Sequence, residues 1–311
     1  MNTNLRVIFL GTPDFAVESL KHLIEGGINI VAVVTAPDKP AGRGMLLQQS
    51  PVKKYALSQN IPVLQPEKLK SVDFISTLKS FNADLQVVIA FRMLPEAVWN
   101  MPRLGTINLH ASLLPDYRGA APINWAIING EKITGVSTFL LKHEIDTGDI
   151  IDKREVSIGA TTTAGELHDE LMKVGAEVIL ESVKKIESGN YNPIPQANTS
   201  TKIAPKIFTP QCQINWQKTG SEVFNQIRGL SPYPGAFTHV GESIFKIYAC
   251  HFIPASHHLE IQSGKIFVNK EKPAFIRFAV ADGWIEVTDV QLQGKKRMKA
   301  DELLRGWRIE D

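Results

Sequence analysis

The chain has 311 residues, 43% hydrophobic and 21% charged, with a net charge of +2, which is typical of a soluble globular protein of two domains. No apolar run reaches the roughly 20 residues that a membrane helix requires, and the first residues lack a signal-peptide pattern. Cys212 and Cys250 are too few for a disulfide framework and lack the spacing of a zinc site. We therefore expect a cytoplasmic monomer with no metal and no membrane contact.

The first half of the chain alternates strand-like and helix-like patterns. Apolar runs typical of buried strands occur at residues 5–11, 29–36, 61–64, 83–91 and 105–112. A helical pattern at 14–27 closes on two glycines, and a second at 50–60 has Ser50 as N-cap and Pro51 at its first position. Continuous apolar strands separated by helices predict a Rossmann-like α/β domain with a mostly parallel sheet.

The second half changes character after a long amphipathic helix at 161–186. A connector rich in Pro, Asn and Thr follows, and then a helix at 219–230. Short alternating strands separated by turns are predicted at 243–252, 264–270, 274–280 and 283–292. This pattern is typical of a small all-β, OB-like barrel. We predict a catalytic domain at 1–190, a linker at 191–206 and a β-barrel domain at 207–311.

The strand-like segment "INLHAS" carries polar residues where a buried strand would carry apolar ones. Because side chains alternate along a strand, Asn108, His110 and Ser112 are expected on one face, near the carboxyl edge where open parallel sheets bind ligands. A hydrogen-bonded core histidine with a capping asparagine is the alternative. A nicotinamide site is not supported, since Gly11 stands alone and Pro13 removes a backbone N–H.

A carboxylate follows a second apolar strand. Asp146 comes after residues 136–141 and is also expected at a strand end. A carboxylate beside an imidazole orients the ring and stabilises its charged form. A set of Asn, His and Asp suits acyl or formyl transfer, in which the Asn donates to an oxyanion and the His moves protons. No G-x-S-x-G elbow is present, so a covalent acyl-enzyme is not favoured.

Two segments, "NLHASLLPDYRGAAP" and "DTGDII", resemble the signature of the 10-formyltetrahydrofolate-dependent formyltransferases. The resemblance continues in "FLGTPDFAVESL", "TAPDKPAGRGMLLQQSPVK", "IRGLSPYPGAF" and "LQGKKRM", and it runs from about Val7 to Gly306. The "PAGRG" loop and the C-terminal domain are similar to those of the branch whose formyl acceptor is the α-amine of initiator methionyl-tRNA. The resemblance thus implies a folate cosubstrate, 10-formyltetrahydrofolate, and a tRNA partner.

The resemblance also implies roles for individual residues. Asn108, His110 and Asp146 form the catalytic set, in which Asn108 and His110 stabilise the tetrahedral oxyanion and Asp146 supports the charged form of His110. The folate-contacting positions that it implies are Ser112, Leu113, Leu114 and Pro115, together with Phe91, Arg92, Met93 and Leu94. Phe91-Arg92 stands where Tyr-Gly is commoner in the family. Backbone groups are expected to read the pterin edge there all the same, and Arg92 to reach the anionic folate tail.

Two basic clusters fit an RNA partner. Between Asp38 and Lys70 there are six Lys or Arg residues against two acids, and four cations occur within Lys295 to Lys299. Phosphate contacts by such cations supply affinity for RNA, although charge runs are also found on ordinary solvated surfaces. The positions that we predict to bind tRNA, with Arg43 the foremost, are Lys39, Arg43, Lys53, Lys295, Lys296 and Arg297.

Three alternatives remain at this point. The first is a related folate-dependent enzyme that formylates an amino sugar, because "APINWAIINGE" resembles that branch. The second is a 10-formyltetrahydrofolate hydrolase, in which water replaces the amine. The third is an RNA-binding protein with a degenerate catalytic domain, which the intact Asn108, His110 and Asp146 set disfavours.

Overall fold

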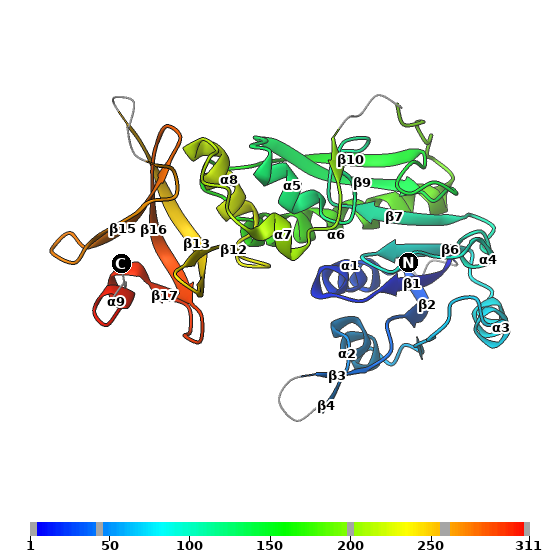
Figure 1. Cartoon of the computed structure of the whole chain (residues 1–311). Helices are drawn as coiled ribbons and strands as arrows, with labels where there is room; N and C mark the ends of the chain where they lie inside the picture. Colours follow the sequence, from blue (N-terminus) through cyan, green and yellow to red (C-terminus); the bar gives the residue numbers. More distant parts are fainter. Residues whose placement is uncertain (1–4, 42–45, 198–201, 256–261, 308–311) are drawn as a thin grey trace. The chain divides into compact units, whose positions relative to one another are not determined.

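The structure is a computed structural model that describes residues 5–41, 46–197, 202–255 and 262–307 (Figure 1). These residues form two compact units. Unit 1 comprises the described residues within 1–119, 134–156 and 168–203, and unit 2 comprises those within 120–133, 157–167 and 204–311. Since unit 2 takes in two segments, 120–133 and 157–167, that interrupt the residues of unit 1, the units do not follow one cut in the sequence. The division into 1–190, 191–206 and 207–311 stays a prediction.

Unit 1 is built on a seven-stranded sheet. Its strands, in spatial order, are β10 (Ile150–Ser157), β9 (Ile133–Leu140), β7 (Thr106–His110), β6 (Leu85–Ile89), β1 (Arg6–Gly11), β2 (Asn29–Val34) and β5 (Val63–Leu64). The strands from β5 to β7 pair in parallel, which confirms the predicted sheet, whereas β9 runs antiparallel to β7. The strand order reverses between β1 and β6, so the segments that follow β1, β6 and β7 leave the sheet at the edge where such folds bind ligands.

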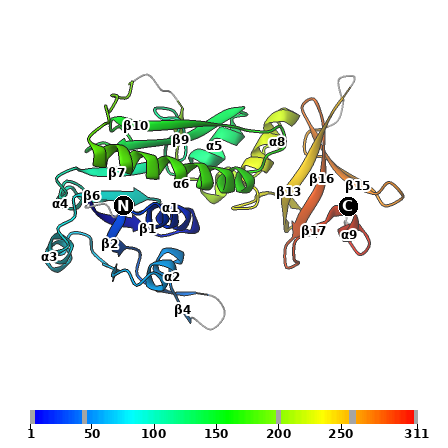
Figure 2. The same cartoon turned by 180° about the vertical axis from the view of Figure 1, so that it is seen from behind.

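Helices cover this sheet. They are α1 (Asp14–Glu25), α2 (Pro51–Ser58), α3 (Val72–Ser80), α4 (Glu96–Trp99) and α6 (Ala164–Ser188). The Ser50 Oγ accepts a hydrogen bond from the Lys53 N–H at 3.1 Å, so Ser50 caps α2 as predicted. Figure 2 shows α6 lying across β7 and β9. A Cβ on Gly175 of α6 would lie 2.8 Å from the Leu109 side chain, so a glycine allows this close approach.

The apolar core holds the sheet rigid. Phe9, Leu20 and Ile107 are almost completely buried. On one side of the sheet, Ile8 and Val88 belong to a buried cluster that includes residues of α3. Full burial of each large apolar side chain contributes about 1.5–3 kcal/mol. The strands whose ends carry the polar residues are therefore anchored in a well-packed apolar core.

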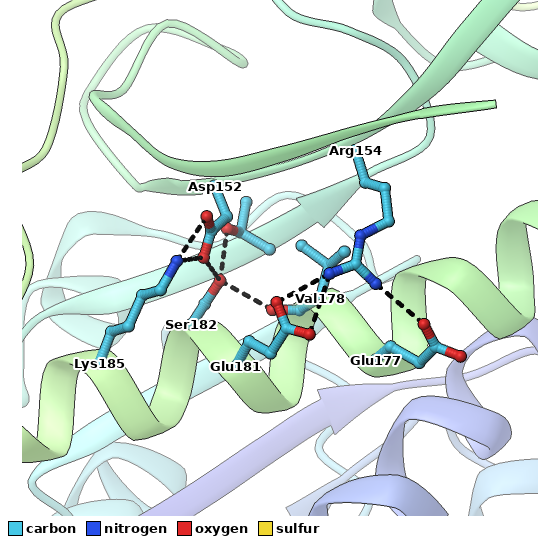
Figure 3. Close-up of polar contacts among 8 residues, drawn as sticks. Asp152, Arg154, Glu177, Val178, Glu181, Ser182 and Lys185 are labelled. Atoms are coloured by element: carbon cyan, nitrogen blue, oxygen red, sulfur yellow. Dashed lines mark hydrogen bonds and ion pairs between the residues drawn. The ribbon is translucent and has the colours of Figure 1, made fainter.

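Strand β10 presents opposite faces to two different neighbours. Asp152 and Arg154 face α6, where Arg154 pairs with Glu177 and Glu181 at 2.9 Å and Asp152 accepts from Lys185 at 2.6 Å (Figure 3). Alternation places Lys153 on the other face of the strand. There the Lys153 Nζ donates a hydrogen bond to the carbonyl oxygen of Leu114. Strand β10 thus links α6 to the loop that follows β7.

Short strands form two further pairs. β3 (Lys39–Ala41) pairs antiparallel with β4 (Leu46–Gln48), and β8 (Arg118–Gly119) pairs with β11 (Ile203–Ala204). No helix among the described residues combines the length and the hydropathy that crossing a membrane would need.

Unit 2 is an antiparallel sheet with helices packed on it, consistent with the predicted OB-like domain. Its strands are β12 (Ala236–Val240), β13 (Ser243–Pro254), β16 (Gly283–Leu292), β15 (Phe275–Val280) and β14 (Ile266–Asn269), with β17 (Met298–Lys299) beside β16. Its helices are α5 (Pro122–Ile128), α7 (Thr209–Cys212), α8 (Gly220–Gly229) and α9 (Ala300–Leu304). The core includes Phe245, Phe278 and Ile227, all almost fully buried.

Candidate active site

The predicted catalytic residues Asn108 and His110 lie at the carboxyl end of β7. In the sheet, Asn108 pairs with Val88 of β6 and Phe139 of β9, and both neighbours are buried. His110 is the last residue of β7 and is 8% exposed. Because they are two positions apart on one strand, their side chains point to the same side of the sheet. Ser112 falls beyond the end of β7, so the alternation argument does not reach it.

The imidazole of His110 has an acceptor on each side. Its Nε2 lies 2.9 Å from the carbonyl oxygen of Tyr117, which can only accept, so Nε2 carries a hydrogen. Its Nδ1 lies 3.9 Å from the Asp146 Oδ2. Tyr117 has a backbone φ of +59°, a left-handed conformation that costs an ordinary residue about 1–2 kcal/mol. The fold accepts this strain at the residue whose carbonyl holds the ring.

Asp146 is brought to His110 by the turn between β9 and β10. Its own backbone is left-handed, with φ of +55°, which an aspartate tolerates better than most residues. The Gly119 N–H donates to the Asp146 Oδ2 at 3.0 Å, so the oxygen that faces His110 is also held by the backbone of β8. The carboxylate side chain is 13% exposed. The predicted trio therefore converges at one place, with its carboxylate oriented before any ligand arrives.

The amide of Asn108 is different. It makes no side-chain hydrogen bond to any residue within the described parts of the chain, and Asn108 is half-buried. An amide N–H in such a place is available to a ligand oxygen, which is the property an oxyanion donor needs.

Hydrogen bonds with polar groups of neighbouring segments fix the loop formed by Ser112, Leu113, Leu114 and Pro115. The Ser137 Oγ of β9 donates to the Ser112 carbonyl at 2.7 Å and accepts from the Leu114 N–H at 3.0 Å. The Ser112 Oγ donates to the Asp116 carbonyl at 2.6 Å. Lys153 donates to the Leu114 carbonyl, and burial lowers the pKa of Lys153, opposed in part by Asp116. The hydroxyl of Ser112 therefore holds its own loop together.

The second predicted folate segment follows β6. Leu94 is buried, Phe91 packs partly into the core, and Met93 is 74% exposed. The guanidinium of Arg92 donates to the backbone carbonyls of Glu67, at 2.9 Å, and Pro66. The segment thus leaves the sheet at the same edge as the end of β7, and the Arg92 guanidinium is engaged by two backbone carbonyls.

The predicted tRNA-binding residues fall into two groups. Lys39, Lys295 and Lys296 are exposed, and Arg43 lies outside the described residues. The other two are held by carboxylates. The Lys53 Nζ lies 2.6 Å from Asp38, and this hydrogen bond lowers the pKa of Asp38.

Arg297 is held in a similar way by unit 2. Its Nε donates to Asp289 at 2.7 Å, and its guanidinium lies 4.4 Å from the centre of the Tyr248 ring. The hydrogen bond from Arg297 is the main cause that lowers the pKa of Asp289.

Three residues near the trio were not found from the sequence: Ser137, Lys153 and Gln196. Ser137 stands out only as a polar residue inside an apolar strand, and Lys153 reads as one of several charges on β10. Gln196 lies in the segment predicted to be a linker. Its Nε2 donates to the carbonyls of Asp146, at 2.9 Å, and Gly148, at 2.7 Å. Among the described residues, no group of three metal-ligating side chains is found.

A Rossmann-like sheet with Asn, His and Asp side chains gathered at its strand ends has the arrangement that group transfer requires. The family model described as formyl transferase matches residues 5–183, and that described as formyl transferase, C-terminal domain, matches residues 206–308. A methionyl-tRNA formyltransferase of Bacteroides thetaiotaomicron is 52% identical over 99% of this chain and 97% of its own length. One of Flavobacterium johnsoniae is 48% identical over 99% and 98%. The chain belongs to the formyl transferase family, among the methionyl-tRNA formyltransferases.

Solved structures share the fold at low identity. An N-formyltransferase from Helicobacter canadensis, solved with folinic acid and dTDP-3-aminofucose, has a TM-score of 0.65 at 21% identity, covering 91% of this chain and 98% of that one. HypX from Aquifex aeolicus, solved with tetrahydrofolic acid, has a TM-score of 0.65 at 18% identity, covering 97% of this chain and 47% of that one. Both comparisons support the fold seen here.

Proposed function

We propose that this chain transfers the formyl group of 10-formyltetrahydrofolate to the α-amine of initiator methionyl-tRNA in the cytoplasm. The observation that carries the proposal is the convergence of Asn108, His110 and Asp146 at the end of β7: the Asn108 amide has no hydrogen-bond partner within the described parts of the chain, and the His110 imidazole lies 3.9 Å from the Asp146 carboxylate. The full-length identity to methionyl-tRNA formyltransferases supports the choice of acceptor. A folate-type donor agrees with the ligands named for the structural neighbours.

In this reaction the methionyl nitrogen forms a bond to the formyl carbon, and the bond from that carbon to the folate nitrogen breaks. One proton leaves the amine and one is gained by the folate nitrogen. Asn108 donates a hydrogen bond to the formyl oxygen as it becomes an oxyanion. His110 stands next to Asn108 on the same side of the sheet and contributes its charge and a proton path. Asp146, held by the Gly119 N–H, keeps the ring oriented and balances its charge.

The folate is proposed to bind along the two fixed segments beside the trio. Ser112 to Pro115 and Phe91 to Leu94 offer backbone groups at the same edge of the sheet. The hydrogen bonds from Ser137 and Lys153 pre-organise the first segment, which reduces the ordering that binding requires. Arg92 fixes its segment through hydrogen bonds to the carbonyls of Pro66 and Glu67. To reach the anionic folate tail, its guanidinium would give up these two hydrogen bonds.

The tRNA is proposed to contact the exposed cations Lys39, Lys295 and Lys296, together with Arg43, which lies outside the described residues. Residues 207–311 form the tRNA-binding domain in this proposal. Arg297 and Lys53 take part as well, with their charge partly balanced by Asp289 and Asp38. Binding that rests on phosphate contacts weakens steeply as salt is raised.

The proposal is tested with purified protein, 10-formyltetrahydrofolate and charged initiator or elongator methionyl-tRNA in parallel. We expect formylation of the initiator form, and a loss of turnover of roughly 10²–10⁴-fold in His110→Ala and in Asp146→Ala, as for groups that move or support protons. Formylation of a nucleotide-linked amino sugar in place of methionyl-tRNA would refute the acceptor. Release of formate without any acceptor would indicate a hydrolase.

A further inference from the structure

Gln196 is bound more extensively than a residue of a flexible linker would be. Each hydrogen of its amide is directed to a backbone carbonyl of the Asp146 turn, that of Asp146 at 2.9 Å and that of Gly148 at 2.7 Å. Its Oε1 accepts from Arg118, at 2.6 Å from Nη2 and 3.2 Å from Nε. All donors and acceptors of the amide are therefore used within unit 1.

The orientation of this amide follows from its neighbours. If the oxygen and nitrogen of Gln196 were exchanged, an oxygen would face the two carbonyls and an NH₂ group would face the guanidinium of Arg118. Both arrangements are repulsive, so the observed orientation is the only one that satisfies the contacts. A glutamate at this position would keep the size and the contact with Arg118 but lose both donors.

The contacts of Gln196 close a ring around Asp146. The Asp146 carboxylate is held by the N–H of Gly119, and Gly119 follows Arg118 in β8. Arg118 in turn holds Gln196, which holds the carbonyl of Asp146 itself. The turn is thus fixed at its side chain by one segment and at its backbone by another. The left-handed φ of +55° at Asp146 is sustained by these bonds and not by a regular helix or strand.

We propose that Gln196 is a positioning residue that sets the Asp146 turn so that the carboxylate stays beside His110. The separation of 3.9 Å between the Asp146 Oδ2 and the His110 Nδ1 is near the limit of an ion pair, so a small displacement of the turn breaks the contact. Catalytic groups must be held within about 0.5 Å of their productive places. The inference rests on the proposed function for its kinetic consequence, and on geometry alone for the position of the carboxylate.

The test compares Gln196→Glu and Gln196→Leu with Asn192→Leu, which changes an exposed residue of the same connector. We expect both Gln196 variants to lose about 10- to 100-fold in kcat with near-normal KM for both substrates, because a misplaced group affects turnover at this scale. Gln196→Glu should be impaired about as much as Gln196→Leu, since it lacks the two donors. Asn192→Leu should behave as the wild type.

A second measurement needs no substrate. The ¹⁵N resonances of the His110 ring, recorded on histidine-labelled protein and assigned with His110→Gln, report the carboxylate beside Nδ1. We expect them to shift in both Gln196 variants and to stay in place in Asn192→Leu. Thermal unfolding of each variant shows that the comparison is made on folded protein.

Three results overturn the inference. They are wild-type kcat in Gln196→Glu, unchanged His110 resonances in both Gln196 variants, and a loss confined to the KM for methionyl-tRNA. The proposed function fails separately, through the absence of formyl transfer by the wild type, and the resonances then still decide whether Gln196 positions Asp146.

Discussion

A single methyl group added at Gly148 tests how precisely the Asp146 turn must be placed. Gly148 is buried between β9 and β10, and its carbonyl accepts from Gln196. A Cβ at this position would lie 1.5 Å from the carbonyl oxygen of Leu140 and 3.0 Å from Cδ2 of Phe139. Real Cβ atoms essentially never approach other atoms below 3.0 Å, so in Gly148→Ala the turn and the end of β9 must separate by roughly 1.5 Å.

A movement of that size exceeds the roughly 0.5 Å within which catalytic groups must be held. We expect Gly148→Ala to lower kcat by about 10²-fold, because it displaces the Asp146 carboxylate from His110. In the wild type the Asp146 Oδ2 lies 3.9 Å from the His110 Nδ1. Overpacking of this kind also destabilises a folded protein by about 1–3 kcal/mol. We expect the KM for the folate donor to change little, since the loop of Ser112 to Pro115, which we propose to contact the folate, is held by its own hydrogen bonds from Ser137 and Lys153.

The assay is steady-state formylation of methionyl-tRNA, with thermal unfolding of the same samples. Gly306→Ala is the matched control, because a Cβ there meets nothing within 4 Å and its backbone is not left-handed. A kcat of Gly148→Ala within twofold of the wild type would refute the reasoning, because it would mean that the turn tolerates the displacement.

Three further predictions follow from the polar groups. The hydrogen bond from Arg297 lowers the pKa of Asp289 in the folded protein. The ionised carboxylate therefore stabilises the fold at pH values above the pKa of an aspartate in the unfolded chain, about 3.9, and this stabilisation is lost as the pH falls through the lower pKa of the folded state. We therefore expect wild type and Asp289→Asn to differ in their free energy of unfolding, measured in urea, by an amount that is constant above about pH 5 and shrinks below about pH 4. A difference that grows on acidification would contradict this. Burial raises the pKa of Cys250 to about 12, so iodoacetamide should leave this thiol unmodified in the native protein and alkylate it after denaturation, as mass spectrometry can show. Lys153→Met leaves the Leu114 carbonyl without its donor, at a cost of about 1–3 kcal/mol, and should raise the KM for the folate donor more than it lowers kcat; an unchanged KM would show that the loop does not depend on this amine.

Much of the fold follows from patterns that are local in the sequence. Apolar runs separated by amphipathic helices predict the mostly parallel sheet, and Ser50 followed by Pro51 predicts the start of α2. The antiparallel direction of β9 does not follow, because a strand buried on both faces has the same apolar pattern in either direction. The pairing of β9 with β7 nevertheless decides where the following turn, and with it Asp146, is delivered.

The sequence alone determined which polar side chains to look for at the candidate site: Asn108 and His110 share a face because a strand alternates, and an acid follows the next apolar strand. Only the tertiary structure decided how that acid is held. Gln196 lies 50 residues from Asp146 and 78 from Arg118, and nothing in its own segment distinguishes it from a linker residue. A side-chain amide finds its partners through the path of the whole backbone, so hydrogen bonds between such distant segments appear only once the chain has folded.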